Sequence, residues 1–149
     1  MDKGYFPYGN KSIEFLLKRT LFLCDYLNKR GVVRIILACN TLSLITLPFI
    51  KLFYKNVTGV FDYFIPFIND KSAIMGSNNT IKILKEIYPN NNLIDGSILI
   101  EHIENNKNYN NLIKKLNNNI KYNSNLILAC THFIELNGDD FIIPIIKNS

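Results

Sequence analysis

The sequence predicts an α/β protein with mostly parallel strands, and three observations lead to this prediction. Short apolar runs alternate along the 149 residues with longer segments of helical periodicity. Two of these runs, residues 35–39 and 126–130, end in Ala-Cys and continue into small polar residues. The apolar fraction of 48% is sufficient for a buried core. We therefore expect two buried strands that each present a cysteine at the carboxyl end.

A first subdomain is expected over residues 1–66. Its predicted elements are a loop at 1–9, a helix from Lys11 to about Lys29 capped by Ser12, a strand at 32–38, a helix at 41–52 that Pro48 kinks or ends, and a strand at 58–63. Residues 64–68 are predicted to be helix or loop.

A second subdomain is expected over residues 67–137, and residues 138–149 are expected to return a strand to the first one. The predicted elements are strands at 72–75, 93–95, 125–129 and 141–145, and helices at 80–88 and 105–123. Residues 97–103 are apolar but show no clear period.

Composition excludes several classes of function. The net charge is +5, but the lysines are scattered and arginine supplies only 3 of 17 basic residues, so we expect no nucleic-acid partner. No apolar run approaches the roughly 18–20 residues of a membrane span, and the first residues do not resemble a secretory signal. We expect a cytoplasmic protein without a membrane partner.

The three cysteines, at positions 24, 39 and 130, form no CxxC pair, which argues against a structural zinc site and a disulfide framework. Cys24 lies within a helical pattern and is expected to be a core residue. Cys39 and Cys130 remain as candidate catalytic thiols, with buried small residues as the alternative interpretation.

The chemistry of these two thiols follows from their expected place. Ligands in open α/β sheets bind beyond the carboxyl ends of strands, where a following helix directs N–H groups and its positive end. This field lowers a thiol pKa from about 8.5 and binds carboxylate. The side chains of Asn40, Thr41, Thr131 and Ser77 add hydrogen-bond donors.

Two thiols on opposite faces of a carbon acid suit inversion of its configuration. One thiolate removes the α-proton, and the other thiol returns a proton from the far side. His132 follows Cys130 closely and is a candidate local acid or base.

Several motifs resemble those of glutamate racemase, in the aspartate/glutamate racemase superfamily. The two cysteine signatures are residues 37–43 (LACNTLS) and 128–133 (LACTHF). Residues 7–9 match a Pro-Tyr-Gly motif, residues 76–81 resemble a Gly-Thr-x-x-Thr-Ile turn, and residues 99–104 resemble a segment that ends in an acidic residue of the active site.

This resemblance implies two similar α/β subdomains with the active site at their interface. It implies cofactor-independent interconversion of L- and D-glutamate, which supplies D-glutamate for peptidoglycan. Cys39 and Cys130 would be the two acid/base residues, and Glu104 and His132 would lie beside them. The residues implied to bind substrate are Tyr8, Gly9, Asn40, Thr41, Ser77, Thr80, Thr131 and His132. No metal or cofactor is implied.

The chain also departs from the family pattern. The family's first strand, with its Asp-Ser and glycines, and its closing helix have no counterpart here, so we expect a truncated relative. The alternatives are a homologue that only binds a carboxylate ligand, a racemase for aspartate or a related acid, and a redox protein with a Cys39–Cys130 disulfide. Homodimerisation is left open.

Overall fold

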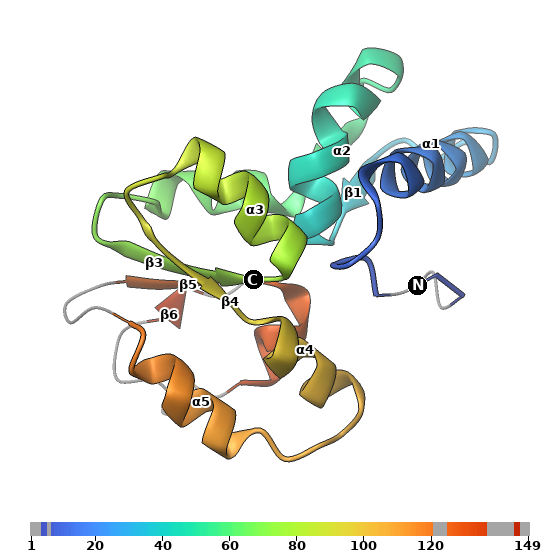
Figure 1. Ribbon diagram of the computed structural model, residues 1–149. Coiled ribbons are helices and arrows are strands. Elements are labelled where there is room, and N and C mark those ends of the chain that lie inside the picture. The colour runs from blue at the N-terminus through green and yellow to red at the C-terminus, as the bar shows by residue number, and fades with distance from the viewer. Residues whose placement is uncertain (1–3, 6, 121–124, 137–144, 147–149) are drawn as a thin grey trace.

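A computed structural model describes residues 4–5, 7–120, 125–136 and 145–146. Helices and strands alternate in the α/β manner (Figure 1). The helices are α1 (Ile13–Asn28), α2 (Asn40–Phe53), α3 (Asn78–Ile87), α4 (Ser97–Glu104) and α5 (Asn110–Asn117). The strands are β1 (Ile35–Leu37), β2 (Val57–Gly59), β3 (Ser72–Gly76), β4 (Asn92–Asp95), β5 (Asn125–Ala129) and β6 (Ile145–Ile146). Three 3-10 helices are η1 (Val60–Tyr63), η2 (Ile65–Phe67) and η3 (Thr131–Glu135).

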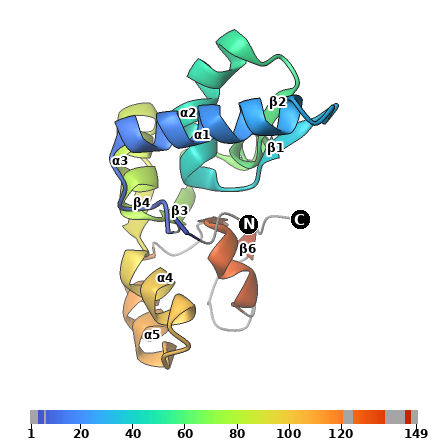
Figure 2. The same cartoon turned by 90° about the vertical axis from the view of Figure 1, so that its right-hand side faces the viewer.

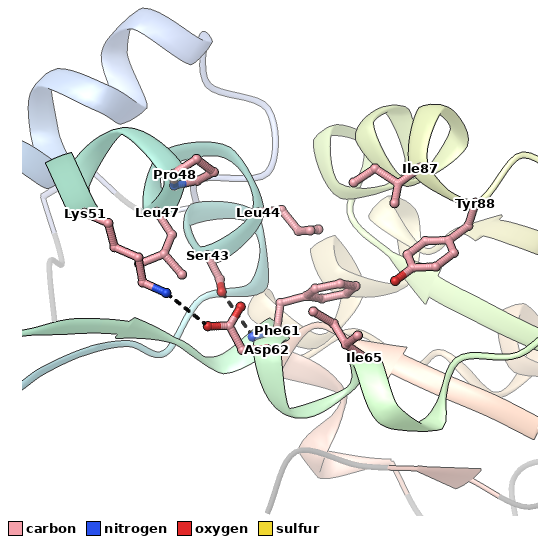
Figure 3. A pocket seen from close by; sticks show the side chains of 10 residues that line it. All are labelled: Ser43, Leu44, Leu47, Pro48, Lys51, Phe61, Asp62, Ile65, Ile87 and Tyr88. Carbon is pink, nitrogen blue, oxygen red and sulfur yellow. Dashed lines mark hydrogen bonds and ion pairs between the residues drawn. The ribbon is translucent and has the colours of Figure 1, made fainter. Parts of the chain in front are cut away.

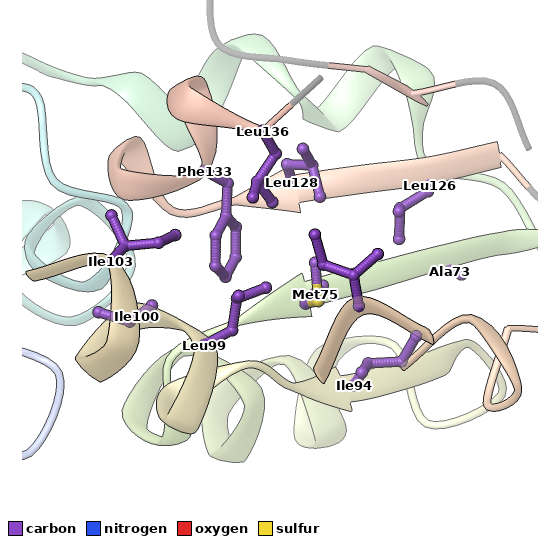
Figure 4. Packing of buried hydrophobic residues seen from close by; sticks show 11 residues of the cluster. Ala73, Met75, Ile94, Leu99, Ile100, Ile103, Leu126, Leu128, Phe133 and Leu136 are labelled. Atoms are coloured by element: carbon purple, nitrogen blue, oxygen red, sulfur yellow. The ribbon is translucent and has the colours of Figure 1, made fainter. Parts of the chain in front are cut away.

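A parallel four-stranded sheet in the order β4-β3-β5-β6 forms the larger core. Its central strands are buried on both faces. Ile74 and Ile127 pack in the cluster that includes Leu84 of α3, whereas Met75 and Leu128 pack against α4, α5 and η3 (Figure 4). Figure 1 accordingly shows α3 on one side of the sheet and α4 and α5 on the other. Burial on both faces explains why these strands are continuous apolar runs in the sequence.

A parallel pair, β1 and β2, forms the smaller sheet. Ile35, Leu37 and Val57 pack together with Ile50 of α2, while Ile36 on the other face is 53% exposed. Figure 2 shows α1 and α2 grouped at this end of the molecule, with α4 and α5 at the opposite end.

The start of α1 at Ser12 and the continuation of α2 past Pro48 have different causes. Ser12 caps α1 by accepting the N–H of Phe15 at 3.2 Å, as its sequence predicts. The sequence left open whether Pro48 kinks or ends the second helix. It does not end the helix, because α2 runs on to Phe53. Burial of the flanking Leu47 and Ile50 stabilises the helix on both sides of the proline.

The other elements differ from the predicted ones in three places. Residues 97–104 form α4, whose first N–H bonds to Asp95 Oδ1 at 2.9 Å. The long helix expected over 105–123 is α5 alone within the described residues, and Asn106, with a positive φ of 51°, lies in the turn that precedes it. The expected strand 58–63 is β2 followed by η1.

The last described strand, β6, pairs with β5 of the larger sheet. We expected residues 138–149 to return to the first subdomain, and this pairing differs from that expectation. Most of that segment, including 141–144 of the expected strand, lies outside the described residues, as do 121–123 of the expected helix. The subdomain boundaries stay a prediction.

Candidate active site

Cys39 occupies the N-cap of α2, directly after β1. Its backbone carbonyl accepts the N–H of Ser43 at 2.8 Å, which places the residue in the first turn of the helix. The Cys39 side chain makes no capping hydrogen bond; burial raises the pKa of its thiol, and the nearby N–H groups of Leu42 and Thr41 and the Thr41 hydroxyl oppose that rise. The arrangement of strand, cysteine and helix that the sequence predicts is therefore present here.

The hydroxyls of Thr41, Ser77 and Thr80 form a buried triangle that joins α2 to the start of α3. Thr41 Oγ1 lies 2.9 Å from Ser77 Oγ and 3.1 Å from Thr80 Oγ1, and the latter two atoms are 3.1 Å apart. All three residues are buried. Three predicted substrate-binding residues are thus held together, although they come from two separate sequence segments.

The Tyr8–Gly9 loop is fastened to the same place. A Cβ on Gly9 would lie 2.8 Å from Ser77 Cβ, so the loop approaches α3 as closely as only a glycine allows. The Gly9 carbonyl accepts the N–H of Asn79 at 3.3 Å, and Asn79 Nδ2 donates to the Lys11 carbonyl at 2.8 Å. The role of Asn79 was not predicted, because no local pattern relates it to a loop about 70 residues earlier.

Asn40 is almost completely buried, at 1% exposure, and neither its Nδ2 nor its Oδ1 has a hydrogen-bond partner in the described structure. Leaving a buried polar group unpaired costs about 1–3 kcal/mol, so such groups are rare in cores. An amide beside Cys39 with one free donor and one free acceptor is suited to a ligand that carries both kinds of group.

Cys130 follows β5 in the same way, but its neighbours differ. Its Sγ lies 3.2 Å from His132 Nδ1, and His132 Nε2 lies 3.1 Å from Glu104 Oε1 of α4. The second contact has an ion-pair distance without the alignment of a hydrogen bond. The thiol, imidazole and carboxylate lie in a row, and the thiol–imidazole hydrogen bond is the step along which a proton can move.

The protonation of the two thiols differs from the sequence prediction. Burial raises the pKa of Cys39 despite the opposing effect of the polar groups at the start of α2. The pKa of Cys130 is raised to about 12, mainly by burial and also by negative charge on Cys39 and Glu104, while the backbone N–H of His132 opposes the rise. The expectation of thiolates stabilised near neutrality is therefore wrong for this structure, because desolvation outweighs the helix N-terminus. At Cys130, moreover, the following helix is only the five-residue η3.

The two cysteines belong to one electrostatic environment. Negative charge on Cys39 contributes to the raised pKa of Cys130. Burial lowers the pKa of His132, although Glu104 and Glu135 oppose this effect. His132 is therefore a neutral imidazole near pH 7, able to accept the proton of Cys130.

The predicted residues thus form two clusters around the thiols. Tyr8, Gly9, Asn40, Thr41, Ser77 and Thr80 lie on the Cys39 side, and His132 and Glu104 contact each other at Cys130. Thr131 is exposed at the start of η3, and no described contact joins it to either cluster. In the part of the chain that the structure describes, no group of three metal-ligating side chains gathers.

Comparison with known proteins gives a consistent result. No protein-family model matches the chain. Glutamate racemase of Borreliella burgdorferi is 28% identical over 171 residues, which cover 99% of this chain and 63% of that protein. Glutamate racemase of Buchnera aphidicola is 34% identical over 91 residues, covering 59% of this chain and 36% of that protein.

Solved structures agree with these relatives. Glutamate racemase of Francisella tularensis, in complex with D-glutamate, superposes with a TM-score of 0.81 at 22% identity, covering 99% of this chain and 64% of that one. The Thermus thermophilus enzyme, in complex with β-chloro-D-alanine, has a TM-score of 0.79 at 20% identity, covering 99% and 63%. The resemblance to glutamate racemases and the predicted α/β fold are confirmed. The chain spans slightly less than two-thirds of the length of these relatives.

Among the described helices, none has the length and apolar character needed to cross a membrane.

Proposed function

We propose that this chain, whose relatives over almost all of its length are glutamate racemases, interconverts L- and D-glutamate without a cofactor. Cys39 and Cys130 act as the two acid/base residues, one for each enantiomer. The product D-glutamate serves peptidoglycan synthesis in the cytoplasm. The strongest support is that Cys39 and Cys130 each directly follow a parallel strand, in a chain that aligns over 99% of its length with a glutamate racemase.

The proton balance of the reaction is simple. One cysteine, as thiolate, takes the α-proton of glutamate and becomes a thiol, while the opposite thiol gives its proton to the other face of the carbon. The substrate returns to its original charge with inverted configuration, and the two cysteines have exchanged protonation states. The reverse reaction or exchange with solvent restores them.

The groups beside the thiols have separate tasks in this proposal. His132 Nδ1 lies 3.2 Å from Cys130 Sγ and is the base placed to exchange a proton with that thiol. The unpaired Asn40 amide donates to the substrate carboxylate and accepts from its ammonium group, which satisfies both of its free atoms. Ser77 and Thr80 assist with carboxylate binding.

The test is α-proton exchange in deuterated water, started separately from L- and D-glutamate and followed by NMR and optical rotation. We expect racemisation in the unmodified chain and a loss of at least about 100-fold in Cys39→Ser and in Cys130→Ser, the range of a lost general acid or base. Cys24→Ala is the matched control: this third cysteine packs in the core with Ile35 and Val57, so exchange should continue in the folded variant.

The outcomes are distinct. A folded chain that exchanges no α-proton from either enantiomer contradicts the proposal, even if it binds glutamate. Faster exchange with L-aspartate than with L-glutamate would assign the chain to a different substrate.

A further inference from the structure

The segment before α1 meets α3 through a single turn, closed by the N–H of Lys11, which donates to the Tyr8 carbonyl at 3.1 Å. Tyr8 is buried, and Cys39 packs against the cluster to which it belongs. Gly9 lies against Ser77, whose hydroxyl is part of the triangle at the start of α3. The turn therefore borders the Cys39 side of the candidate active site.

Asn79 of α3 fastens this turn at two points. Its backbone N–H donates to the Gly9 carbonyl at 3.3 Å, and its side-chain Nδ2 donates to the Lys11 carbonyl at 2.8 Å. The first end of the turn is held by the burial of Tyr8, but Asn10 and Lys11 are exposed. At the exposed end, the side-chain amide thus supplies an attachment to α3 that burial does not.

Contacts that do not involve Asn79 hold both thiols. Ser43 donates its N–H to the Cys39 carbonyl at 2.8 Å, and its hydroxyl accepts the N–H of Phe61 at 3.1 Å, which joins the start of α2 to η1 (Figure 3). Cys130 follows β5, which pairs with β3 and β6 in the larger sheet. Release of the turn from α3 should therefore leave both thiols in place.

We propose that Asn79 is a positioning residue for substrate binding. Its side-chain amide holds the turn against Ser77 and so raises the affinity for glutamate without acting on the proton transfers. This inference rests on the proposed function, in which Ser77 and Thr80 assist with carboxylate binding. When the amide is removed, binding must first dock the turn again, and the apparent affinity falls in proportion to the docked fraction.

The experiment compares Asn79→Ala with Asn78→Ala. Alanine favours a helix at either position. Asn78 is the matched control, because the described bond from this neighbouring asparagine is made by its backbone N–H, which donates to Ser97 Oγ at 2.9 Å and is kept in the variant. We would measure kcat and KM for L-glutamate in the unmodified chain and in both variants. The dissociation constant of D-glutamate is measured by NMR titration of the same three chains carrying Cys39→Ser and Cys130→Ser, which cannot racemise the ligand.

We expect KM and the dissociation constant to rise about fivefold in Asn79→Ala, the effect of one net hydrogen bond. The value of kcat should not change, and Asn78→Ala should change neither constant. A merely structural role gives a different result, because a smaller folded fraction lowers the apparent kcat and leaves KM as it was.

Unchanged KM and dissociation constant in Asn79→Ala, an equal rise in Asn78→Ala, or a fall in kcat alone would overturn the inference. Failure of the proposed function gives a different pattern. If the unmodified chain exchanges no α-proton but the dissociation constants still differ between the two variants, the racemase proposal fails and the role of Asn79 stands. An unmodified chain that racemises glutamate with the same KM as Asn79→Ala refutes the role of Asn79 alone. A chain that neither racemises nor binds glutamate refutes both.

Discussion

The two cysteine sites share a sequence pattern but have different chemical surroundings. Cys39 begins a 14-residue helix and is surrounded by N–H groups, hydroxyls and the Asn40 amide. Cys130 begins a five-residue 3-10 helix and has an imidazole and a carboxylate in a row. The Cys39 side is thus built to bind polar groups, and the Cys130 side to move a proton. Similar motifs therefore do not imply similar roles for their neighbours.

The largest effect is expected from a substitution of His132, which should act on one cysteine site and not on the other. L- and D-glutamate are equally stable, so a racemase has equal kcat/KM in both directions and the difference must be measured in a half-reaction. Elimination of HCl from 3-chloroglutamate needs only one base. In His132→Asn we expect chloride release from one enantiomer to fall about 100-fold or more, and from the other much less.

The matched comparison for that variant is Thr41→Val, which changes the neighbour of the other cysteine. Its larger effect should fall on the opposite enantiomer, because the Thr41 hydroxyl acts on the pKa of Cys39. Equal losses for both enantiomers in His132→Asn would show that the imidazole does not serve Cys130 specifically.

The second prediction concerns stability at alkaline pH. The pKa of Cys130 is about 12 in the folded chain against a reference of 9.0, so above pH 9 the unfolded chain releases a proton that the folded chain retains. Stability is therefore complete below pH 9 and is lost as the pH rises toward 12. Between pH 9 and 11 this thiol should remove about 2 kcal/mol from the free energy of unfolding.

Urea unfolding at several pH values, compared between the unmodified chain and Cys130→Ala, isolates this contribution, since the other titrating groups are common to both. The unmodified chain should lose more stability over this interval. Parallel pH profiles would mean that the Cys130 thiol is better solvated than its burial indicates.

The smallest expected effect tests the hydroxyl triangle on the Cys39 side. Thr41→Val preserves shape but removes a partner of the buried Ser77 and Thr80 hydroxyls, which should cost about 1–2 kcal/mol of unfolding free energy. Thr46→Val is the matched control on the same helix. Its buried hydroxyl donates only to the Leu42 carbonyl, one turn earlier, and should cost less than 1 kcal/mol.

Chemical denaturation measures both variants. A Thr41→Val cost no greater than that of Thr46→Val would mean that the triangle does not stabilise the junction of α2 and α3.

Much of the fold and of the site could be predicted from local sequence. The Ser12 cap, the apolar runs of β3 and β5, and the strand ends at Cys39 and Cys130 all follow from short-range patterns. The extent of α2 was close to the predicted 41–52, but the sequence left open whether Pro48 ends the helix, because that depends on packing around Leu47 and Ile50. The turn between α4 and α5, where Asn106 has a positive φ, could not be predicted either, because the asparagine-rich segment is equally compatible with a helix surface.

The sequence by itself determined which groups stand at the two strand ends, because a strand, its cysteine and its polar cap are fixed by residues within a few positions. The tertiary structure alone decided the state of those groups. Desolvation of a thiol depends on what packs around it, and the contacts of His132 with Glu104 and of Thr41 with Ser77 join residues about 30 positions apart. Local sequence therefore gave the thiols their place, and burial gave them their high pKa.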